Sequence, residues 1–410
     1  MAQKQNSVPL SAIYKAKELL ESVIEPTPIE RSRNISARTG VDIFLKCENL
    51  NRAGSFKIRG AYNRIARLSD QEKSKGIVAS SAGNHAQGVA LAAQLLGISA
   101  TIFMPEGASV PKVLATEAYG AEVRQEGRTI DESLQYAQKF GHETGAVLIH
   151  PFDHPDIVAG QGTCGLEILE QCPEVKTIVV SLGGGGLLAG IATAVKSTHP
   201  HVRIIGVQAE QAAAYPSSII RGHPVSLEKM TTMADGIAVG CPGKVPFEII
   251  RAHVDDIVTV SENNLSTAML FILERSKMVV EPAGAAAVAY LLNNTQIDGP
   301  AVAVLSGGNV DPVLLMRILR HGMTAAGRYM QLWVKVPDMP GNLAGLLTDI
   351  AALDANVLEV EHTRIGSELL VDEVEINIEI ETKGFQHRKE VLRVLREKGY
   401  KVTVKSPHLE

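Results

Sequence analysis

The sequence predicts an α/β protein built on parallel sheets, followed by a smaller domain of a different kind. Of its 410 residues, 45% are hydrophobic but only 4% are aromatic, and 36 are glycine. Such a composition suits parallel strands covered by helices rich in small residues. Strand-like and helix-like patterns also alternate from about residue 40 to residue 305, as they do when helical crossovers join parallel strands.

Five strands of the expected sheets can be placed from short apolar runs. They cover residues 42–46, 76–80, 100–104, 177–181 and 301–305. Helices are expected from Ser55 and from Asn84. Ligands of open parallel sheets bind beyond the carboxyl ends of the strands, where loops lead into helices. Three loops occupy that position, at residues 80–85, 181–186 and 306–309.

The pattern changes near residues 320–330, where a helix closes and a tail of different rhythm begins. Strand, helix, strand, strand, helix and strand are expected at residues 331–336, 341–353, 356–363, 369–381, 386–398 and 400–404. This βαββαβ order is typical of a ferredoxin-like sandwich with its own small core. We therefore expect a first domain of residues 1–325, with a smaller subdomain at about residues 48–150, and a second domain of residues 326–410.

Composition and charge restrict the partners of the protein. The net charge of −5 gives no general attraction to nucleic acid or to anionic membranes. The most apolar stretch, residues 283–292, is about half the length of a membrane helix. The four cysteines form no C-x-x-C pair, and residues 1–6 lead into no hydrophobic signal core. We therefore expect a cytoplasmic protein that binds neither nucleic acid nor membrane.

Four consecutive glycines, Gly183, Gly184, Gly185 and Gly186, separate an apolar strand-like run from an apolar helical run. Glycine costs about 1 kcal/mol relative to alanine in regular structure. Such a run is therefore kept where the backbone needs positive φ or must touch another group. Successive N–H groups at a helix start bind anions, helped by the helix dipole. The run is interpreted as a phosphate-binding loop, and the alternative is a flexible loop.

Lys57 is the candidate for covalent chemistry. It lies at the expected start of a helix that Ser55 can cap, between the apolar residues Phe56 and Ile58. The positive end of the helix dipole and the apolar neighbours both disfavour the ammonium form. A neutral amine is what Schiff-base formation requires. The alternative is a lysine that simply extends into solvent.

A candidate amine, a phosphate-binding loop and an Asn-His loop together suggest one cofactor, pyridoxal phosphate. Over about residues 5–325 the chain resembles the fold type II pyridoxal-phosphate enzymes, and among them the serine/threonine dehydratases. The motifs that carry the resemblance are S-F-K-I-R-G at 55–60, S-S-A-G-N-H at 80–85, A-G-Q-G-T at 159–163, S-L-G-G-G-G-L at 181–187, A-D-G-I-A-V at 234–239, E-P-A-G-A at 281–285 and S-G-G-N at 306–309.

The resemblance implies two open parallel-sheet subdomains and the cofactor pyridoxal 5'-phosphate. It implies that Lys57 forms an imine with the cofactor aldehyde, that the glycines and Leu187 hold the phosphate, and that Asn84 meets the ring hydroxyl. Ser306 falls where the family contacts the pyridine nitrogen. Glu281 lies near the cofactor in that family, although helix capping would also explain it. The implied cofactor-binding residues are Phe56, Lys57, Asn84, Gly183, Gly184, Gly185, Gly186, Leu187, Gly236 and Ser306.

The implied reaction is the dehydration and deamination of L-threonine to 2-oxobutanoate and ammonia, with L-serine as a slower substrate that gives pyruvate. The freed Lys57 removes the α-proton and the β-hydroxyl leaves. The implied catalytic residues are Lys57, Ser306 and Glu281. Relatives that racemise serine usually carry a second serine where this chain has Ala82, so elimination is favoured over racemisation.

The substrate carboxylate is expected at a helix start that offers free N–H groups. The implied substrate-binding residues are Ser81, Ala82, Gly83, Asn84 and His85. For His85, a packed structural histidine is an equal alternative.

Three alternative functions remain open. A serine racemase, a cysteine synthase or another β-elimination or β-replacement enzyme on the same scaffold would share these motifs. A dinucleotide-binding oxidoreductase is disfavoured because the glycine run lacks the G-x-G-x-x-G spacing. A non-catalytic amino-acid sensor is disfavoured because the chain retains Lys57 and the glycine run.

No metal site is expected. Gln208 stands where racemase-like relatives place a carboxylate for a divalent ion, and surface solvation better explains Glu210. His150, Asp153 and His154 resemble a ligand cluster, but the adjoining prolines indicate a turn.

Residues 330–405 resemble an ACT domain, in which the strand-to-helix turn, here residues 337–343, binds amino-acid effectors. Gly341 permits close approach of the backbone, so Gly341, Asn342 and Leu343 are the expected effector residues. The alternative is an oligomerisation module with an empty site. The resemblance implies an allosterically regulated homotetramer. The sequence leaves open whether the enzyme serves isoleucine biosynthesis or threonine catabolism.

Overall fold

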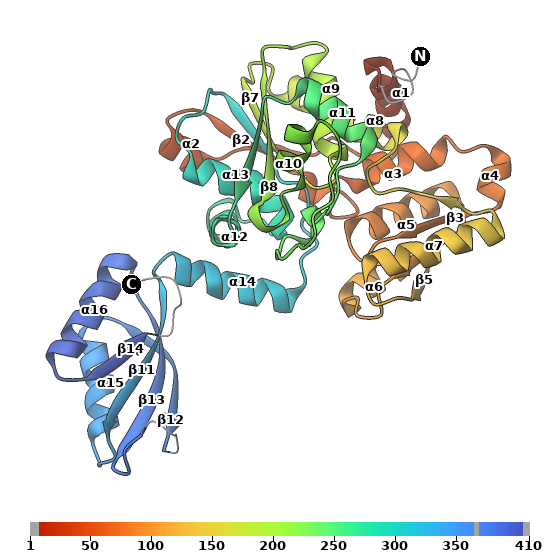
Figure 1. Ribbon diagram of the computed structural model, residues 1–410. Coiled ribbons are helices and arrows are strands. Elements are labelled where there is room, and N and C mark those ends of the chain that lie inside the picture. Colours follow the sequence, from red (N-terminus) through yellow and green to blue (C-terminus); the bar gives the residue numbers. More distant parts are fainter. Residues whose placement is uncertain (1–7, 365–368, 405–410) are drawn as a thin grey trace. The chain divides into compact units, whose positions relative to one another are not determined.

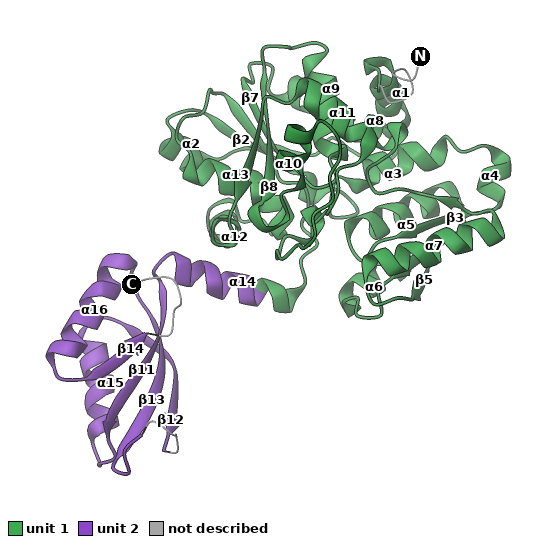
Figure 2. Cartoon of the chain, viewed as in Figure 1, with its two compact units in different colours: residues 1–315 green, residues 316–410 purple. Residues whose placement is uncertain are grey.

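The structure is a computed structural model that describes residues 8–364 and 369–404. The chain divides into two compact units, residues 1–315 and 316–410 (Figure 2). The division falls within helix α14 (Pro312–Ala325), ahead of the boundary expected after residue 325. Arg320, in the second half of α14, donates hydrogen bonds to Tyr329 and Glu379, so this half of the helix packs on the tail.

Unit 1 contains two separate sheets (Figure 1). The larger sheet has the strand order β1-β2-β10-β7-β8-β9, and its neighbouring strands are parallel except for the β1–β2 pair. Its strands are β1 (Ile29–Arg31), β2 (Ile43–Lys46), β7 (Thr177–Ser181), β8 (Arg203–Ala209), β9 (Asp256–Val260) and β10 (Ala301–Val304). The smaller sheet is entirely parallel, with the order β5-β4-β3-β6. Its strands are β3 (Ile77–Ser80), β4 (Ala100–Met104), β5 (Glu122–Gln125) and β6 (Val147–Leu148).

Each sheet of unit 1 has its own hydrophobic core. Val180 of β7 packs in one core with Leu188, whereas Ile102 of β4 packs in the other with Val89. The helices of unit 1 are α1 (Leu10–Leu20), α2 (Arg33–Thr39), α3 (Lys57–Ala66), α4 (Asp70–Ser74), α5 (Asn84–Leu96), α6 (Val110–Glu117), α7 (Ile130–Thr144), α8 (Pro155–Gln171), α9 (Gly186–Lys196), α10 (Ala214–Arg221), α11 (Lys244–His253), α12 (Glu262–Ser276) and α13 (Pro282–Asn293). Short 3₁₀ turns are η2 (Glu48–Leu50), η3 (Glu210–Ala212) and η4 (Asp235–Ile237). The observed architecture is the α/β fold with two parallel sheets that the alternating pattern predicts.

Helices α3, α8 and α9 touch one another through their main chains. A Cβ atom added to Gly160 of α8 would lie 2.5 Å from the carbonyl oxygen of Arg59 and 2.6 Å from the Cα of Gly60 on α3. On the other side of α8, a Cβ atom added to Gly190 of α9 would lie 2.5 Å from the amide nitrogen of Gly162. Because no side chain fits at these contacts, the main chain of α8 packs directly against α3 on one side and α9 on the other, and it sets the distance between them.

A buried network of four charged side chains holds α3 against the rest of unit 1. The Arg59 guanidinium donates hydrogen bonds to both carboxylate oxygens of Glu48, at 2.7 and 2.8 Å, and to both of Glu167, at 2.5 and 2.9 Å. Lys46 also donates to Glu167, at 2.5 Å. Two cations balance two carboxylates, and the side chain of Arg59 is only 1% exposed. The bidentate geometry offsets the cost of removing these charges from water.

The tail forms the strands and helices that the sequence predicts, in the order βαββαβ. They are β11 (Tyr329–Pro337), α15 (Asn342–Ala352), β12 (Asn356–Thr363), β13 (Glu373–Glu381), α16 (Phe385–Glu397) and β14 (Lys401–Val404). The four strands form an antiparallel sheet in the order β12-β13-β11-β14. Strand β13 begins later than expected because the amide of Glu373 donates to the carbonyl of Leu370, which makes a turn. No helix among the described residues combines the length and apolarity needed to span a bilayer.

The buried network predicts a large loss of stability when one partner is removed. We expect Arg59→Ala to lower the free energy of unfolding by about 3–5 kcal/mol, because two buried carboxylates would be left with Lys46 as their one counter-charge. Lys139→Ala is the matched control, since Lys139 pairs with Glu143 on an exposed face of α7, and it should cost at most about 0.5 kcal/mol. Urea unfolding of both variants tests the expectation, and equal effects would contradict it.

Candidate active site

The three loops that follow strands β3, β7 and β10 meet in one cavity of about 780 Å³. Ser80, Ser181 and Ser306, at the carboxyl ends of these strands, all line it. Residues 226–230 also line the cavity, as does the ion pair between Lys112 of α6 and Asp235 of η4, which is 2.5 Å long. The three loops that the sequence places beyond the strand ends therefore border one cavity.

Lys57 is the first residue of α3, and it points into this cavity. The expected cap is wrong: Phe56 occupies the N-cap position without a side-chain bond, and the Ser55 hydroxyl is buried with no partner among the described residues. Ser55 instead pairs its backbone with Gly307. This pairing joins the start of α3 to the loop after β10.

The amine of Lys57 is easily deprotonated. Burial among the cavity walls lowers its pKa to about 8, and the carboxyl of Glu281 opposes this shift. The Nζ donates to the carbonyl of Pro151 at 3.3 Å and lies 5.1 Å from the centre of the Phe56 ring. A substantial fraction of neutral amine near neutral pH is what imine formation requires.

The glycine run ends at the N-terminus of α9, where Gly185 is the N-cap residue with φ 99° and Gly186 is the first helical residue. A Cβ atom on Gly185 would lie 2.0 Å from the hydroxyl of Tyr215, and one on Gly184 would lie 2.4 Å from the ring of Phe152. The Tyr215 hydroxyl also donates to the Gly184 carbonyl at 3.2 Å. Because the glycines have no side chains, the main-chain N–H groups at this helix start are not covered, as an anion-binding site requires.

Phe152 and Tyr215 were not identified from the sequence. They shape the glycine run from positions about 30 residues away on either side, and neither lies in a recognisable motif. A run of glycines indicates that other side chains can pack closely against it, but it does not indicate which residues those are.

Asn84, Glu281 and Asn309 form a chain of hydrogen bonds beside Lys57. Asn84 Nδ2 donates to Glu281 Oε1 at 2.6 Å, and Asn309 Nδ2 donates to Asn84 Oδ1 at 2.8 Å. Glu281 is the N-cap residue of α13 but makes no capping bond, so capping does not explain its side chain. Burial, assisted by Asp235, raises the pKa of Glu281 to about 7. Asn309 was not assigned a role from the sequence.

The remaining implied cofactor residues also lie on the cavity. Ser181 Oγ donates to Ser306 Oγ at 3.0 Å, which orients a neutral hydroxyl on the wall. Leu187 and Gly236 line the same space. A Cβ atom on Gly236 would lie 2.9 Å from the Cβ of Ala283, so this glycine permits the close approach of η4 to α13.

The loop of residues 81–85 lines the cavity at the start of α5. The amide of Gly83 donates to Ser81 Oγ at 3.2 Å. His85 is hydrogen-bonded through Nε2 to the carbonyl of Ile149 at 2.8 Å, and burial lowers its pKa to about 3. The ring is therefore a neutral, packed histidine, which is the alternative that the sequence left open.

The candidate metal residues have other partners. Gln208 Oε1 accepts from the amide of Tyr215, and Glu210 is exposed. Nδ1 of His150 and Nδ1 of His154 each accept from backbone amides. Within residues 8–364 and 369–404, no three His, Cys, Asp or Glu residues are grouped to hold a metal ion.

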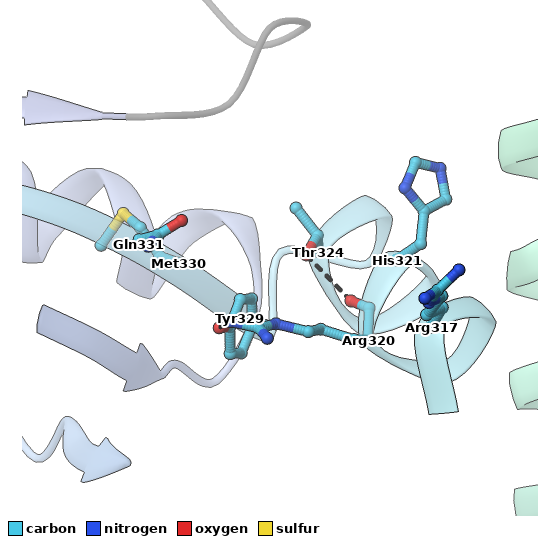
Figure 3. Close-up of a pocket in the computed structure, with 7 residues that line it drawn as sticks. All are labelled: Arg317, Arg320, His321, Thr324, Tyr329, Met330 and Gln331. Atoms are coloured by element: carbon cyan, nitrogen blue, oxygen red, sulfur yellow. Dashed lines mark hydrogen bonds between the residues drawn. The ribbon is translucent and has the colours of Figure 1, made fainter. Parts of the chain in front are cut away.

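A second, smaller cavity of about 280 Å³ lies in unit 2 (Figure 3). Arg320 crosses it and stacks on Tyr329, with 4.9 Å from the guanidinium to the ring centre. Thr324 Oγ1 donates to the Arg320 carbonyl at 2.9 Å. Arg320 is also paired with Glu379, and no lysine is among the seven residues drawn around this cavity in Figure 3.

A lysine of lowered pKa and a bare helix start in one cavity define a site for a cofactor that carries both a carbonyl group and a phosphate. The family model described as "Pyridoxal-phosphate dependent enzyme" matches residues 20–307. The chain belongs to that family. Lys57, the glycine run and Ser306 fit the amine, phosphate and ring-nitrogen contacts of this cofactor.

Individual members of the family and solved structures are similar to much of the chain. The L-threonine ammonia-lyase of Thermotoga maritima is 46% identical over 398 residues, which cover 97% of this chain and 99% of that protein. The processed form of threonine deaminase isoform 2 from Solanum lycopersicum is 36% identical with a TM-score of 0.73, covering 77% of this chain and 87% of that one. Maize serine racemase is 37% identical with a TM-score of 0.73, covering 76% and 96%.

The glycine run predicts a loss of cofactor binding when one residue gains a side chain. We expect Gly185→Ala to weaken pyridoxal-phosphate binding at least about tenfold, because the new methyl group would displace Tyr215 and distort the amides. Gly222→Ala is the control: Gly222 also has positive φ, at 75°, but a Cβ atom there meets nothing within 4 Å. It should cost about 1 kcal/mol of stability and leave cofactor affinity unchanged. Absorbance titration of both variants with pyridoxal phosphate measures the two affinities, and equal affinities would contradict the expectation.

The raised pKa of Glu281 predicts a pH-dependent cost to folding. Between pH 4.5 and 7 the folded chain keeps a proton that the unfolded chain has lost, so this residue destabilises the fold increasingly as pH rises. Glu281→Gln keeps the acceptor for Asn84, and in the cofactor-free chain it should gain up to about 3 kcal/mol at pH 8 but almost nothing at pH 4.5. Urea unfolding at both pH values is the measurement. Glu228→Gln, on the exposed rim, should show no such difference, and an equal gain at both pH values for Glu281→Gln would refute the expectation.

Proposed function

We propose that this protein is a lyase that dehydrates and deaminates L-threonine to 2-oxobutanoate and ammonia, and L-serine more slowly to pyruvate. The observation that carries the proposal is the single cavity that holds Lys57, the glycine run and the residue 81–85 loop. The L-threonine ammonia-lyase relative, which aligns over 97% of this chain, supports the choice of substrate.

In the proposed mechanism, the chain positions the substrate and moves one proton. Pyridoxal phosphate, when bound, supplies the electron sink for the substrate carbon. The glycine run would hold its phosphate, and Ser306 would contact its ring nitrogen as a neutral hydroxyl. The N–H groups at the start of α5 bind the substrate carboxylate. The Lys57 amine takes the proton from the α-carbon, loss of the β-hydroxyl follows, and hydrolysis gives one 2-oxo acid and one ammonia.

Serine racemase is the second candidate, because the chain is 37% identical to the maize enzyme of that name. Racemisation needs a proton donor on the face opposite Lys57, and the methyl side chain of Ala82 cannot supply one. Elimination is therefore the preferred reaction. Chiral analysis of the serine left after incubation would separate the two.

The proposed function also assigns a role to each domain. Residues 1–325 form the catalytic domain, with the smaller subdomain at about residues 48–150, and residues 326–410 form an ACT-type regulatory domain in a cytoplasmic homotetramer. Gly341, the N-cap residue of α15, has φ 97°, and Asn342 Nδ2 donates to the Pro337 carbonyl at 2.9 Å. With Leu343 they form a turn whose N–H groups suit an amino-acid carboxylate. Isoleucine biosynthesis and threonine catabolism both fit this regulation.

One steady-state assay tests the reaction and its regulation. The holoenzyme should release 2-oxobutanoate from L-threonine, and Lys57→Ala should lower kcat at least about 10³-fold because the proton acceptor is lost. Isoleucine or valine should change the rate if the tail binds an amino acid. Borohydride reduction and peptide mapping should find the cofactor on Lys57. A label on another residue of active enzyme would sink the proposal.

A further inference from the structure

His150 lines the cavity but has no part in the proposed reaction. It follows β6 and precedes Pro151, whose carbonyl accepts the hydrogen bond from Lys57 Nζ at 3.3 Å. The next residue, Phe152, packs on Gly184 and Gly186. The turn that His150 begins is therefore in contact with both the reactive amine and the glycine run.

The backbone fixes which nitrogen of His150 carries the proton. Nδ1 accepts from the amide of Asp153 at 2.8 Å and from that of Phe152 at 3.3 Å. A nitrogen that accepts these bonds has no proton of its own, so the neutral ring carries its proton on Nε2. The ring of Phe152 packs edge-on at 4.7 Å between centres, which limits rotation of the imidazole.

The imidazole stays neutral in this position. Burial lowers the pKa of His150, the ammonium of Lys57 and the ring of His154 lower it further, and Asp153 only partly opposes them. Loss of the Nε2 proton would create an imidazolate, and Nδ1 is occupied. With Nδ1 occupied by backbone amides, the neutral ring of His150 can donate a hydrogen bond through Nε2.

The Nε2–H group opens onto the cavity. Within the described chain, no residue accepts a hydrogen bond from it, and it is absent from the buried side-chain atoms that lack a partner. His150 also lies close enough to His85, in the first turn of α5, to lower the pKa of that ring. His150 and the residue 81–85 loop therefore line the same cavity close to each other.

We propose that His150 is a substrate-binding residue whose Nε2–H donates to the carboxylate of the amino-acid substrate. The carboxylate is the only permanent anion of such a substrate, and the N–H groups at the start of α5 supply the other donors. His150 thus adds a fixed side-chain donor to a main-chain site. This assignment rests on the proposed function, because it assumes an amino-acid substrate in the cavity.

The test uses His150→Asn. An asparagine Oδ1 can accept from the amides two and three residues ahead, as Nδ1 does here, so the turn is kept. Its side chain has no donor at the reach of Nε2. We expect the KM for L-threonine to rise about 10- to 100-fold with kcat within threefold, the usual loss for one hydrogen bond to a charged group. The Kd of the holoenzyme for L-2-aminobutyrate, which lacks the β-hydroxyl, should rise by the same factor.

The chain offers a matched control in His154→Asn. Nδ1 of His154 accepts from the amide of Asp156 at 3.1 Å at the start of α8, and His154 is not among the residues that line the cavity. This variant should leave both constants within twofold. His150→Gln restores a donor near the position of Nε2 and should recover most of the affinity, even if His150→Asn proves unstable.

The outcomes are distinct. Unchanged binding of L-2-aminobutyrate by His150→Asn would overturn the proposal, and so would a Gln variant as weak as a folded Asn variant. A rise in the KM for threonine without weaker binding of L-2-aminobutyrate would assign His150 to the β-hydroxyl instead, and would also overturn it. If the parent enzyme releases no 2-oxobutanoate from threonine, the proposed function fails, whereas the binding of L-2-aminobutyrate still tests His150.

Discussion

The distance between Lys57 and the glycine run is set by main-chain contact between helices. Lys57 begins α3, the glycine run begins α9, and α8 lies between them with Gly160 against one and Gly162 against the other. Main-chain atoms have no rotamers, so this spacing does not depend on side-chain conformation. A two-point attachment, covalent at the amine and ionic at the phosphate, needs such a constant span. The A-G-Q-G-T motif therefore helps to shape the cavity although its residues do not line it.

The polar interior of unit 1 complements these contacts. Arg59 follows Lys57 by two residues and anchors the same helix through Glu48 and Glu167, while Asn309 and Glu281 hold Asn84 beside Lys57. Both networks join segments more than 100 residues apart in sequence. They make the cavity a rigid frame, and rigidity of this kind is what positions an amine against a substrate carbon.

Much of this fold could be read from local sequence patterns. The alternation of strands and helices, the glycine run before α9, and the βαββαβ tail all depend on neighbours within about ten residues, where periodicity and turn chemistry carry information. Ser55 illustrates the limit: a serine before a helix predicts a cap, but backbone pairing with Gly307 overrides it. Tyr215 above the glycines and the Asn84–Glu281 bond are long-range contacts, so no local pattern could have identified them.

The part of the cavity wall formed by residues 226–230 is built differently from these networks. Residues 226–230 form a loop that is joined to the neighbouring segment by a main-chain bond from Leu227 to Gly240, and no helix or strand passes through it. Replacements there would alter the volume and polarity of the chamber without shifting the lysine or the glycine run. Evolution or protein engineering could therefore change the substrate preference of the enzyme through this loop and leave the reacting groups in place.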